Sequence, residues 1–391
     1  MKFWQEPKIK KINKKKIIVT SLIVISVILL IVIRIVYINN NKFREYIDTK
    51  ILHKEIHEND AVVVEINELD KSTAIGMNSK IGILKNSKFS IYNNMGHRTK
   101  ELRILISDCI YHQENRFLVL AEKNGKKIYL LENDEIKWQA EAEGNIGCIY
   151  VNSNGYVVVT TTGTSHKTVI GMFDLNGKLM LKSYLSNTIA VDVSVSHDNK
   201  YLAFAELDTS GVTIKSNVKV LSVKNIQENS QEAVEKAYKC ENGKLITDIE
   251  YIGKDKIATM YTDGISILEN GKENKIIELK AKKVVFQDIN IKESLVTIEE
   301  RSTGIFSANS VINIININTL QNKEYTLDDT VKKIYSKDNI IAVNTGTKIE
   351  FINKDGWLVK RYIASKELSN IALGNSIAGI IYRDRIEIIS L

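Results

Sequence analysis

The chain has 391 residues, with 54 Lys+Arg against 47 Asp+Glu and a formal net charge of +7 at pH 7. Removing seven N-terminal lysines, Arg34 and Glu6 leaves 46 basic and 46 acidic residues in the rest of the chain. That part therefore carries no general field for polyanions, which argues against nucleic acid as a partner.

The first element in the chain is an apolar run, Ile17–Ile38, of 22 residues with Arg34 as its one charge. A helix of about 20 apolar residues spans a bilayer core. A cleavable signal peptide is the alternative, but it needs a shorter apolar core and a small-residue cleavage site, whereas Asn39-Asn40-Asn41 follows here. The run thus predicts an uncleaved signal anchor in the lipid bilayer.

The lysine-rich residues 1–16 predict the orientation of this anchor. Cytoplasmic flanks of membrane helices carry an excess of Lys and Arg. We therefore expect a single-pass protein of the cell membrane, with a cytoplasmic N-terminus and an extracytoplasmic C-terminal domain.

Residues 39–60 predict a short helical stalk, because their apolar side chains recur at near-helical spacing. His53 and His57 would share one face of such a helix. Two histidines fall short of the three or four ligands that zinc requires, so no metal site is predicted. The three cysteines imply no disulfide framework. Cys109 and Cys148, which begin matching Cys-Ile-Tyr triplets, are expected to be buried free thiols.

From Ala61 onward, short runs rich in Val, Ile, Tyr and Thr alternate with turns, the pattern of an all-β domain. A hairpin unit of an apolar strand, a turn and a more polar strand begins eight times, at Phe89, Ile128, Ile170, Val218, Ile265, Ile312, Ile349 and Ile386. Three of its turns contain dipeptides suited to type I′ geometry: Asn176-Gly177, Asn270-Gly271 and Asp355-Gly356.

A second strand pair precedes most hairpins, so each period of 37 to 48 residues contains four strands, as in a β-propeller blade. Eight hairpins predict an eight-bladed propeller over residues 61–391. Seven blades remain open if the first and last segments form one composite blade. The final copy stops after three strands, and we expect Ala61–Asn67 to supply its fourth and close the ring.

The lysine-rich tail, the single anchor and the repeat domain with Asn-Gly-Lys hairpins resemble an uncharacterised family of membrane-anchored propeller proteins of Gram-positive bacteria, a domain of unknown function. This resemblance implies an extracytoplasmic propeller and no assigned activity. The blades are also distantly similar to quinoprotein-type and WD40-like propellers and to those of lipoprotein assembly factors. The quinoprotein-type and assembly-factor families carry regular tryptophan docking positions. Only Trp138 and Trp357 lie in the repeats here, so no cofactor is predicted.

Four aspartates occupy the same predicted place in the first strand of four repeats: Asp108, Asp192, Asp248 and Asp288. Gly147 and Lys333 hold that place in two other repeats. First strands line the channel of a propeller, where four carboxylates would form a partial acidic ring. The alternative, which we favour, is that these aspartates begin strands in hydrated surroundings or accept hydrogen bonds from backbone N–H groups of the adjacent turns.

Three long loops between second and third strands, 161–168, 208–217 and 301–310, are rich in Ser, Thr and Gly. We expect them to open on the same face as the aspartates and to contribute candidate ligand residues, unless they have merely drifted in sequence. These residues are Thr164, His166, Ser210, Arg301 and Ser302. On the other face, the insertion 225–243 is expected to form a short helix from Ser230.

The sequence contains no strong catalytic motif, and no catalytic residue is assigned. A non-enzymatic binding or scaffolding module at the cell envelope, with an envelope protein or polymer as its partner, fits these observations best. The alternative is a hydrolase of envelope glycans or peptides that uses channel carboxylates such as Asp192 and Asp248.

Overall fold

A computed structural model describes residues 14–57, 60–66, 72–163, 165–224, 234–240, 244–278, 284–302 and 308–391. The chain divides into two compact units, Met1–Glu55 and Ile56–Leu391.

The first unit is helical. Helix α1 (Lys14–Asn39) contains the apolar stretch Ile18–Ile38, which is long and apolar enough to cross a membrane. Helix α2 (Asn41–Tyr46) begins at Asn40, whose side chain accepts a hydrogen bond from the backbone N–H of Phe43. A π-helical turn, η1 (Ile47–Ile51), follows directly. It is held against α1 by Asp48, which accepts a hydrogen bond from the Tyr37 hydroxyl at 2.6 Å.

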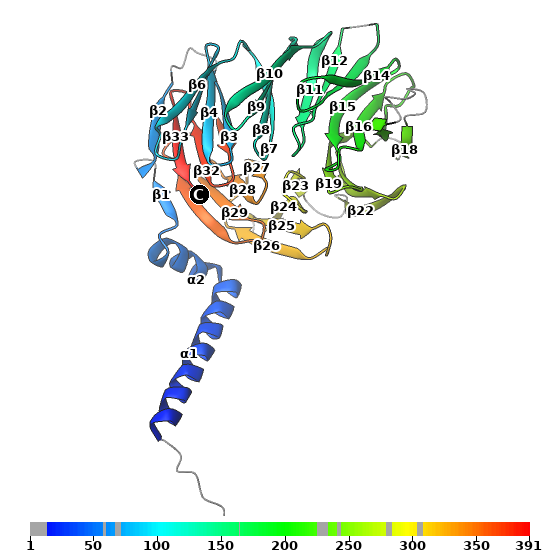
Figure 1. Ribbon diagram of the computed structural model, residues 1–391. Coiled ribbons are helices and arrows are strands. Elements are labelled where there is room, and N and C mark those ends of the chain that lie inside the picture. Colours follow the sequence, from blue (N-terminus) through cyan, green and yellow to red (C-terminus); the bar gives the residue numbers. More distant parts are fainter. Residues whose placement is uncertain are drawn as a thin grey trace, which may run out of the picture. The chain divides into compact units, whose positions relative to one another are not determined.

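The second unit is an eight-bladed propeller of antiparallel strands (Figure 1). The first four blades contain β3 (Ser72–Met77), β4 (Lys80–Lys85), β5 (Lys88–Tyr92) and β6 (Arg98–Arg103); β7 (Cys109–Glu114), β8 (Phe117–Glu122), β9 (Lys127–Glu132) and β10 (Glu135–Glu141); β11 (Asn145–Val151), β12 (Val157–Thr162), β13 (Thr168–Phe173) and β14 (Leu179–Leu185); and β15 (Thr188–Val195), β16 (Tyr201–Asp208), β17 (Lys215–Ser222) and β18 (Val234–Lys239).

The next three blades contain β19 (Ile246–Ile252), β20 (Lys256–Tyr261), β21 (Gly264–Glu269) and β22 (Lys272–Glu278); β23 (Val284–Asp288), β24 (Ser294–Ser302), β25 (Ala308–Asn316) and β26 (Asn322–Leu327); and β27 (Lys333–Lys337), β28 (Ile340–Asn344), β29 (Lys348–Asn353) and β30 (Leu358–Ile363), with β1 (Glu55–His57) as a fifth, outer strand. His57 therefore lies in a strand, and the expected helical face shared with His53 does not form.

The eighth blade closes the ring. It combines β31 (Asn370–Leu373), β32 (Ile377–Ile381) and β33 (Arg385–Ser390) with β2 (Val62–Glu65) from the start of the propeller. Strand β2 pairs antiparallel with β33, beside which Figure 1 shows it. The predicted closure by Ala61–Asn67 is confirmed for its described residues, and the blade count is eight.

The core of the propeller is divided among the interfaces between blades. Eight clusters of buried apolar side chains occur in the described part of the chain, one between each pair of neighbouring sheets around the ring. A single blade would expose both of its faces, so burial of these side chains depends on the closed ring.

The hairpin turns follow two geometries. Asn270 and Gly271 both have positive φ, 51° and 75°, as the predicted type I′ turn requires. In the other two predicted turns only the glycines, Gly177 and Gly356, have positive φ. There the side chain of Asp174 or Asn353 accepts backbone hydrogen bonds across the loop, and the strand pairing shifts by one residue nearby. The type I′ expectation is wrong for those two turns.

The insertion after β17 also differs from its prediction. Residues 225–233 lie outside the described residues, but Val234–Lys239 form β18, the outer strand of the fourth blade, instead of a helix. Tyr238 is buried from this strand against the neighbouring blade. Tertiary pairing with β17 thus overrides the local helix preference.

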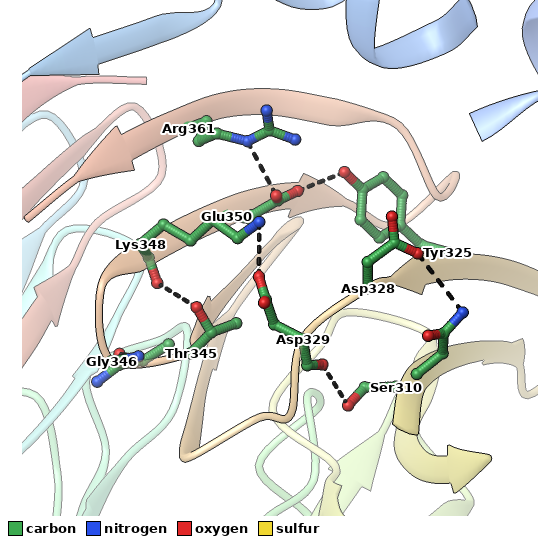
Figure 2. Close-up of polar contacts among 11 residues, drawn as sticks. Ser310, Tyr325, Asp328, Asp329, Thr345, Gly346, Lys348, Glu350 and Arg361 are labelled. Carbon is green, nitrogen blue, oxygen red and sulfur yellow. Dashed lines mark hydrogen bonds and ion pairs between the residues drawn. The ribbon is translucent and has the colours of Figure 1, made fainter. Parts of the chain in front are cut away.

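A buried polar network joins the sixth and seventh blades (Figure 2). Tyr325 on β26 donates its hydroxyl to Glu350 on β29, which also accepts a hydrogen bond from Arg361 Nε at 2.9 Å. Beside this network, Lys348 pairs with Asp329 at 2.6 Å. The contact recurs one repeat later, where the Tyr362 hydroxyl donates to Glu387.

Candidate functional site at the channel mouth

A cavity of about 840 Å³ lies at one end of the central channel. Its walls come from the inner strands of seven blades, β3, β7, β11, β19, β23, β27 and β31, and from the turns that follow inner strands. These turns contribute Asn115, Ser153, His197, Lys254 and Lys292. The cavity is therefore at the end of the channel where inner strands finish, and we call it the mouth cavity.

Bulges set the layers of side chains along the channel. The register shifts by one residue within four inner strands, immediately before Cys148, Asp192, Asp248 and Phe286. These four residues are structurally equivalent. Because side chains alternate along a strand, Tyr150, Ser194, Glu250 and Asp288 form the next layer facing the channel.

The deeper layer contains a pair of interacting carboxyl groups, Asp192 and Asp248. Asp192 also accepts the Ile249 backbone N–H at 2.7 Å and lies 3.6 Å from the Cys148 sulfur. Burial, followed by the neighbouring Asp192 charge, raises the pKa of Asp248 well above its ordinary range. A protonated Asp248 that donates to ionised Asp192 is the arrangement which these contacts favour.

The outer layer faces the mouth cavity with two further carboxyl groups. Glu250 accepts the hydroxyl of Tyr150 at 2.9 Å, and burial raises its pKa to about 8. Asp288 accepts the Ser336 hydroxyl and, at 2.7 Å, the backbone N–H of Asn290, and burial raises its pKa. Both residues line the cavity.

Three side chains on the β7 and β27 walls complete the cavity chemistry. Burial raises the pKa of Glu114 and lowers that of Lys337 to about 8. The ammonium of Lys337 donates to the Gly76 carbonyl at 2.8 Å. His112 Nδ1 accepts the Val151 N–H at 3.2 Å, and burial lowers the pKa of His112 to about 4, so its ring is neutral.

The structure separates the four predicted aspartates. Asp192 and Asp248 meet in the deeper layer, whereas Asp288 belongs to the outer layer, because Phe286, two residues earlier, holds the position equivalent to Asp248. Asp108 is exposed just before β7 and makes no contact with the other three among the described residues. The four carboxyl groups therefore do not form the partial acidic ring that is one of the two interpretations of the sequence.

The long loops lie at the other end of the channel from the cavity. Asn145, at the start of β11, pairs with Thr162, where the first long loop begins, and Thr188 likewise pairs with Asp208. The cavity instead borders the turns after the inner strands. The expected convergence of cavity-lining carboxylates and long loops on one face is not observed.

The predicted loop residues make mostly local contacts. His166 contacts the Ser186 hydroxyl at 3.1 Å, and the Ser210 hydroxyl donates to Asp208 at 2.6 Å. Arg301 pairs with Glu299 at 3.3 Å and with Glu324 at 3.7 Å. Thr164 lies outside the described residues, and Ser302 is described only by the pairing of its backbone with Ala308.

Sequence reasoning missed Glu114, Glu250, His112 and Lys337. Glu250 carried a signal, because it lies two residues after Asp248 on the same strand and alternation places both side chains on one face. The other three could be found only after the inner strands were arranged around the ring.

Several solved structures align with this chain. Dihydro-heme d1 dehydrogenase NirN aligns with a TM-score of 0.50 at 11% identity, over 84% of this chain and 75% of that one. BamB from Moraxella catarrhalis gives 0.47 at 11% identity, over 84% and 100% of the two chains. The C-terminal WD40 domain of Sif2 gives 0.42 at 12% identity, over 71% and 92%. At these identities the likeness concerns the fold alone.

No curated protein matches the sequence. Residues 51–391, which include the whole propeller, match DUF5711, a family of unknown function. The chain belongs to this family.

Proposed function

We propose that this protein is a non-enzymatic binding module held at the outer face of a cell membrane, with an envelope protein or polymer as its partner. The mouth cavity carries the proposal, because all eight blades contribute residues to a space of about 840 Å³. That volume is within the usual range for ligand pockets, about 300–1,000 Å³. The apolar stretch Ile18–Ile38, preceded in sequence by seven lysines, supports an anchor with a cytoplasmic N-terminus.

The geometry supports binding better than hydrolysis. A catalytic acid or base must reach the substrate proton directly or through one water. Asp192 and Asp248 hydrogen-bond to each other and to backbone N–H groups, and the cavity wall is formed by the layer above them. We therefore assign this pair a structural role.

Labelling of intact cells tests the proposed location. Val212 is fully exposed on a long loop of the propeller. A Val212→Cys variant should react with a membrane-impermeant maleimide in intact cells, above the background of the half-buried native cysteines. A Lys15→Cys variant should react only after lysis. The opposite pattern would overturn the proposed orientation.

Partner capture tests the proposed face. Ser153 lines the mouth cavity from the turn after β11, whereas Val212 lies on a loop at the other end of the channel. Ser153→Trp should narrow the cavity and abolish capture of an envelope partner by the full-length protein. Val212→Trp adds the same bulk and should leave capture unchanged. Loss of capture with Val212→Trp alone would move the site to the long loops.

A further inference from the structure

The mouth cavity differs from the blade walls in how its acidic groups are neutralised. Three buried acids in the blade walls each pair with a basic side chain at 2.7–2.9 Å: Glu206 with Lys219, Glu350 with Arg361 and Glu387 with Arg385. Glu114, Glu250 and Asp288 line the cavity, and none of them forms a salt bridge within the described residues. Within the described residues the blades thus form salt bridges with their internal acids, whereas the cavity acids have none, and Lys337 and Lys292 act on Glu114 only through longer-range attraction.

Neutral donors hold two of these acids in place. The Tyr150 hydroxyl orients Glu250, and the Ser336 hydroxyl orients Asp288. Glu250 and Asp288 are half-buried. Partly desolvated carboxyl groups without a counter-cation concentrate at functional sites. The fixed orientation of both carboxyl groups toward one cavity indicates a cation that is supplied from outside the chain.

The remaining charges leave the cavity acidic. Lys337 is the one cationic side chain on the described inner-strand walls, against three carboxyl groups. Its ammonium is engaged with the Gly76 carbonyl. The other charged residues that line the cavity do not reverse the balance, because they comprise three lysines, Lys254, Lys256 and Lys292, and four acids, Asp255, Glu269, Glu293 and Asp338.

The walls suit an organic cation better than a metal ion. Tyr111, Tyr150 and Tyr335 line the cavity, and aromatic faces attract organic cations. His112 stacks on Tyr150 with ring centroids 4.5 Å apart, and its Nδ1 is already occupied by a backbone N–H. Among the described residues, no group of three or more His, Cys, Asp or Glu side chains is arranged to hold a metal ion.

We propose that the mouth cavity binds the primary ammonium group of an organic ligand between Glu250 and Asp288. This inference rests on the proposed function, because it names the chemical group that the envelope partner presents. The ammonium group can belong to a small free amine or to an amine carried on a larger chain. Both sources share the recognised chemistry, and one probe of each kind distinguishes them.

Calorimetry on the full-length protein in detergent tests the proposal with defined probes. Cadaverine represents a free amine, and a tetralysine peptide represents an amine carried on a chain. At least one of them should bind, whereas 1,5-pentanediol and Mg²⁺ should not. Binding by cadaverine assigns the free source, and binding by tetralysine alone assigns the carried source.

Variants place the binding site. Glu250→Gln and Asp288→Asn keep their hydrogen-bond acceptors and should each weaken amine binding at least tenfold. Glu141→Gln removes the same charge from an exposed position on β10 and should change affinity less than twofold. Lys337→Gln removes the competing cation and should tighten binding severalfold, a gain that misfolding cannot produce.

Three results would overturn the inference: no binding of either amine at millimolar concentration, equal binding of the diol or Mg²⁺, or equal weakening by Glu141→Gln. None of these results affects the labelling of Val212→Cys or capture through the mouth face. Failure of the ligand assignment is therefore distinguishable from failure of the proposed function.

Discussion

Removing Arg361 should destabilise the propeller by leaving Glu350 buried without a cation (Figure 2). Glu350 is 1% exposed and Arg361 is 8% exposed, and without Arg361 the carboxylate of Glu350 keeps its hydrogen bond from the Tyr325 hydroxyl, which carries no charge. Breaking one partner of a buried ion pair costs about 3–5 kcal/mol. We expect Arg361→Met to lower stability by that amount.

The expected shift in melting temperature follows from the size of the domain. Roughly 330 residues have an unfolding entropy of about 0.7 kcal/mol/K near 60 °C, so the loss corresponds to about 4–7 °C. Differential scanning calorimetry of the purified full-length protein in detergent measures this shift.

Two controls identify the cause. The double variant Glu350→Gln/Arg361→Met removes both charges and keeps an acceptor for Tyr325, so it should recover most of the loss. Arg98→Met breaks an exposed pair with Glu101 and should shift the melting temperature by about 1 °C or less. A shift below about 1.5 °C for Arg361→Met, or a double variant as unstable as the single one, would refute the reasoning.

Three further predictions concern ring closure, one turn and the buried acid pair. The Ile66 N–H donates to the Asp384 carbonyl, so alternation along β2 directs the Val64 N–H to β33 and the Val63 N–H away from the sheet. Proline at position 64 removes a hydrogen bond of the sheet and proline at position 63 does not, so Val64→Pro should lower the melting temperature several degrees more than Val63→Pro. Gly177 and Gly271 have similar backbone conformations, φ +79° and +75°, but a Cβ on Gly177 would lie 2.9 Å from the ring of Trp138, whereas one on Gly271 meets nothing within 4 Å. Gly177→Ala should therefore lower folding stability more than Gly271→Ala, which loses only the backbone penalty of about 1–2 kcal/mol. Equal melting temperatures of the two variants would contradict the contact with Trp138. The pKa of Asp248 is raised in the folded state above its unfolded value of about 3.9, so protonated Asp248 contributes its full stabilisation below about pH 3.9, and this stabilisation is lost as the pH rises through the folded pKa. Asp248→Asn still donates to Asp192 and should flatten the decline of folding stability between about pH 5 and pH 9. An unchanged slope of stability against pH in denaturant titrations would argue against a protonated Asp248.

The features predicted correctly from sequence are local or countable. Hairpins repeat within 37 to 48 residues, and their apolar and turn residues follow directly along the chain. The closing strand was predictable because the last repeat has three strands and Ala61–Asn67 had no partner. Both inferences need only the period-two pattern and the requirement that a blade bury both faces.

The errors arise where register or pairing depends on the folded sheet. Asp288 lies in the layer of Glu250, although its sequence motif aligns it with Asp248, because Phe286 holds the position equivalent to Asp248 in the folded sheet. Strand β18 forms in a segment with a local helical pattern because β17 offers an edge for pairing. The pairing register of the folded sheet decides which residues of different blades are equivalent, and a sequence motif does not encode that register.

The sequence by itself determined an apolar run of membrane-spanning length, a near-neutral remainder and eight repeated strand groups, because each follows from residues close together in the chain. Only the tertiary structure decided which acids share the mouth cavity. Tyr150 and Glu250 are 100 positions apart, yet their side chains meet at 2.9 Å, because the closed ring brings inner strands of separate blades around one channel.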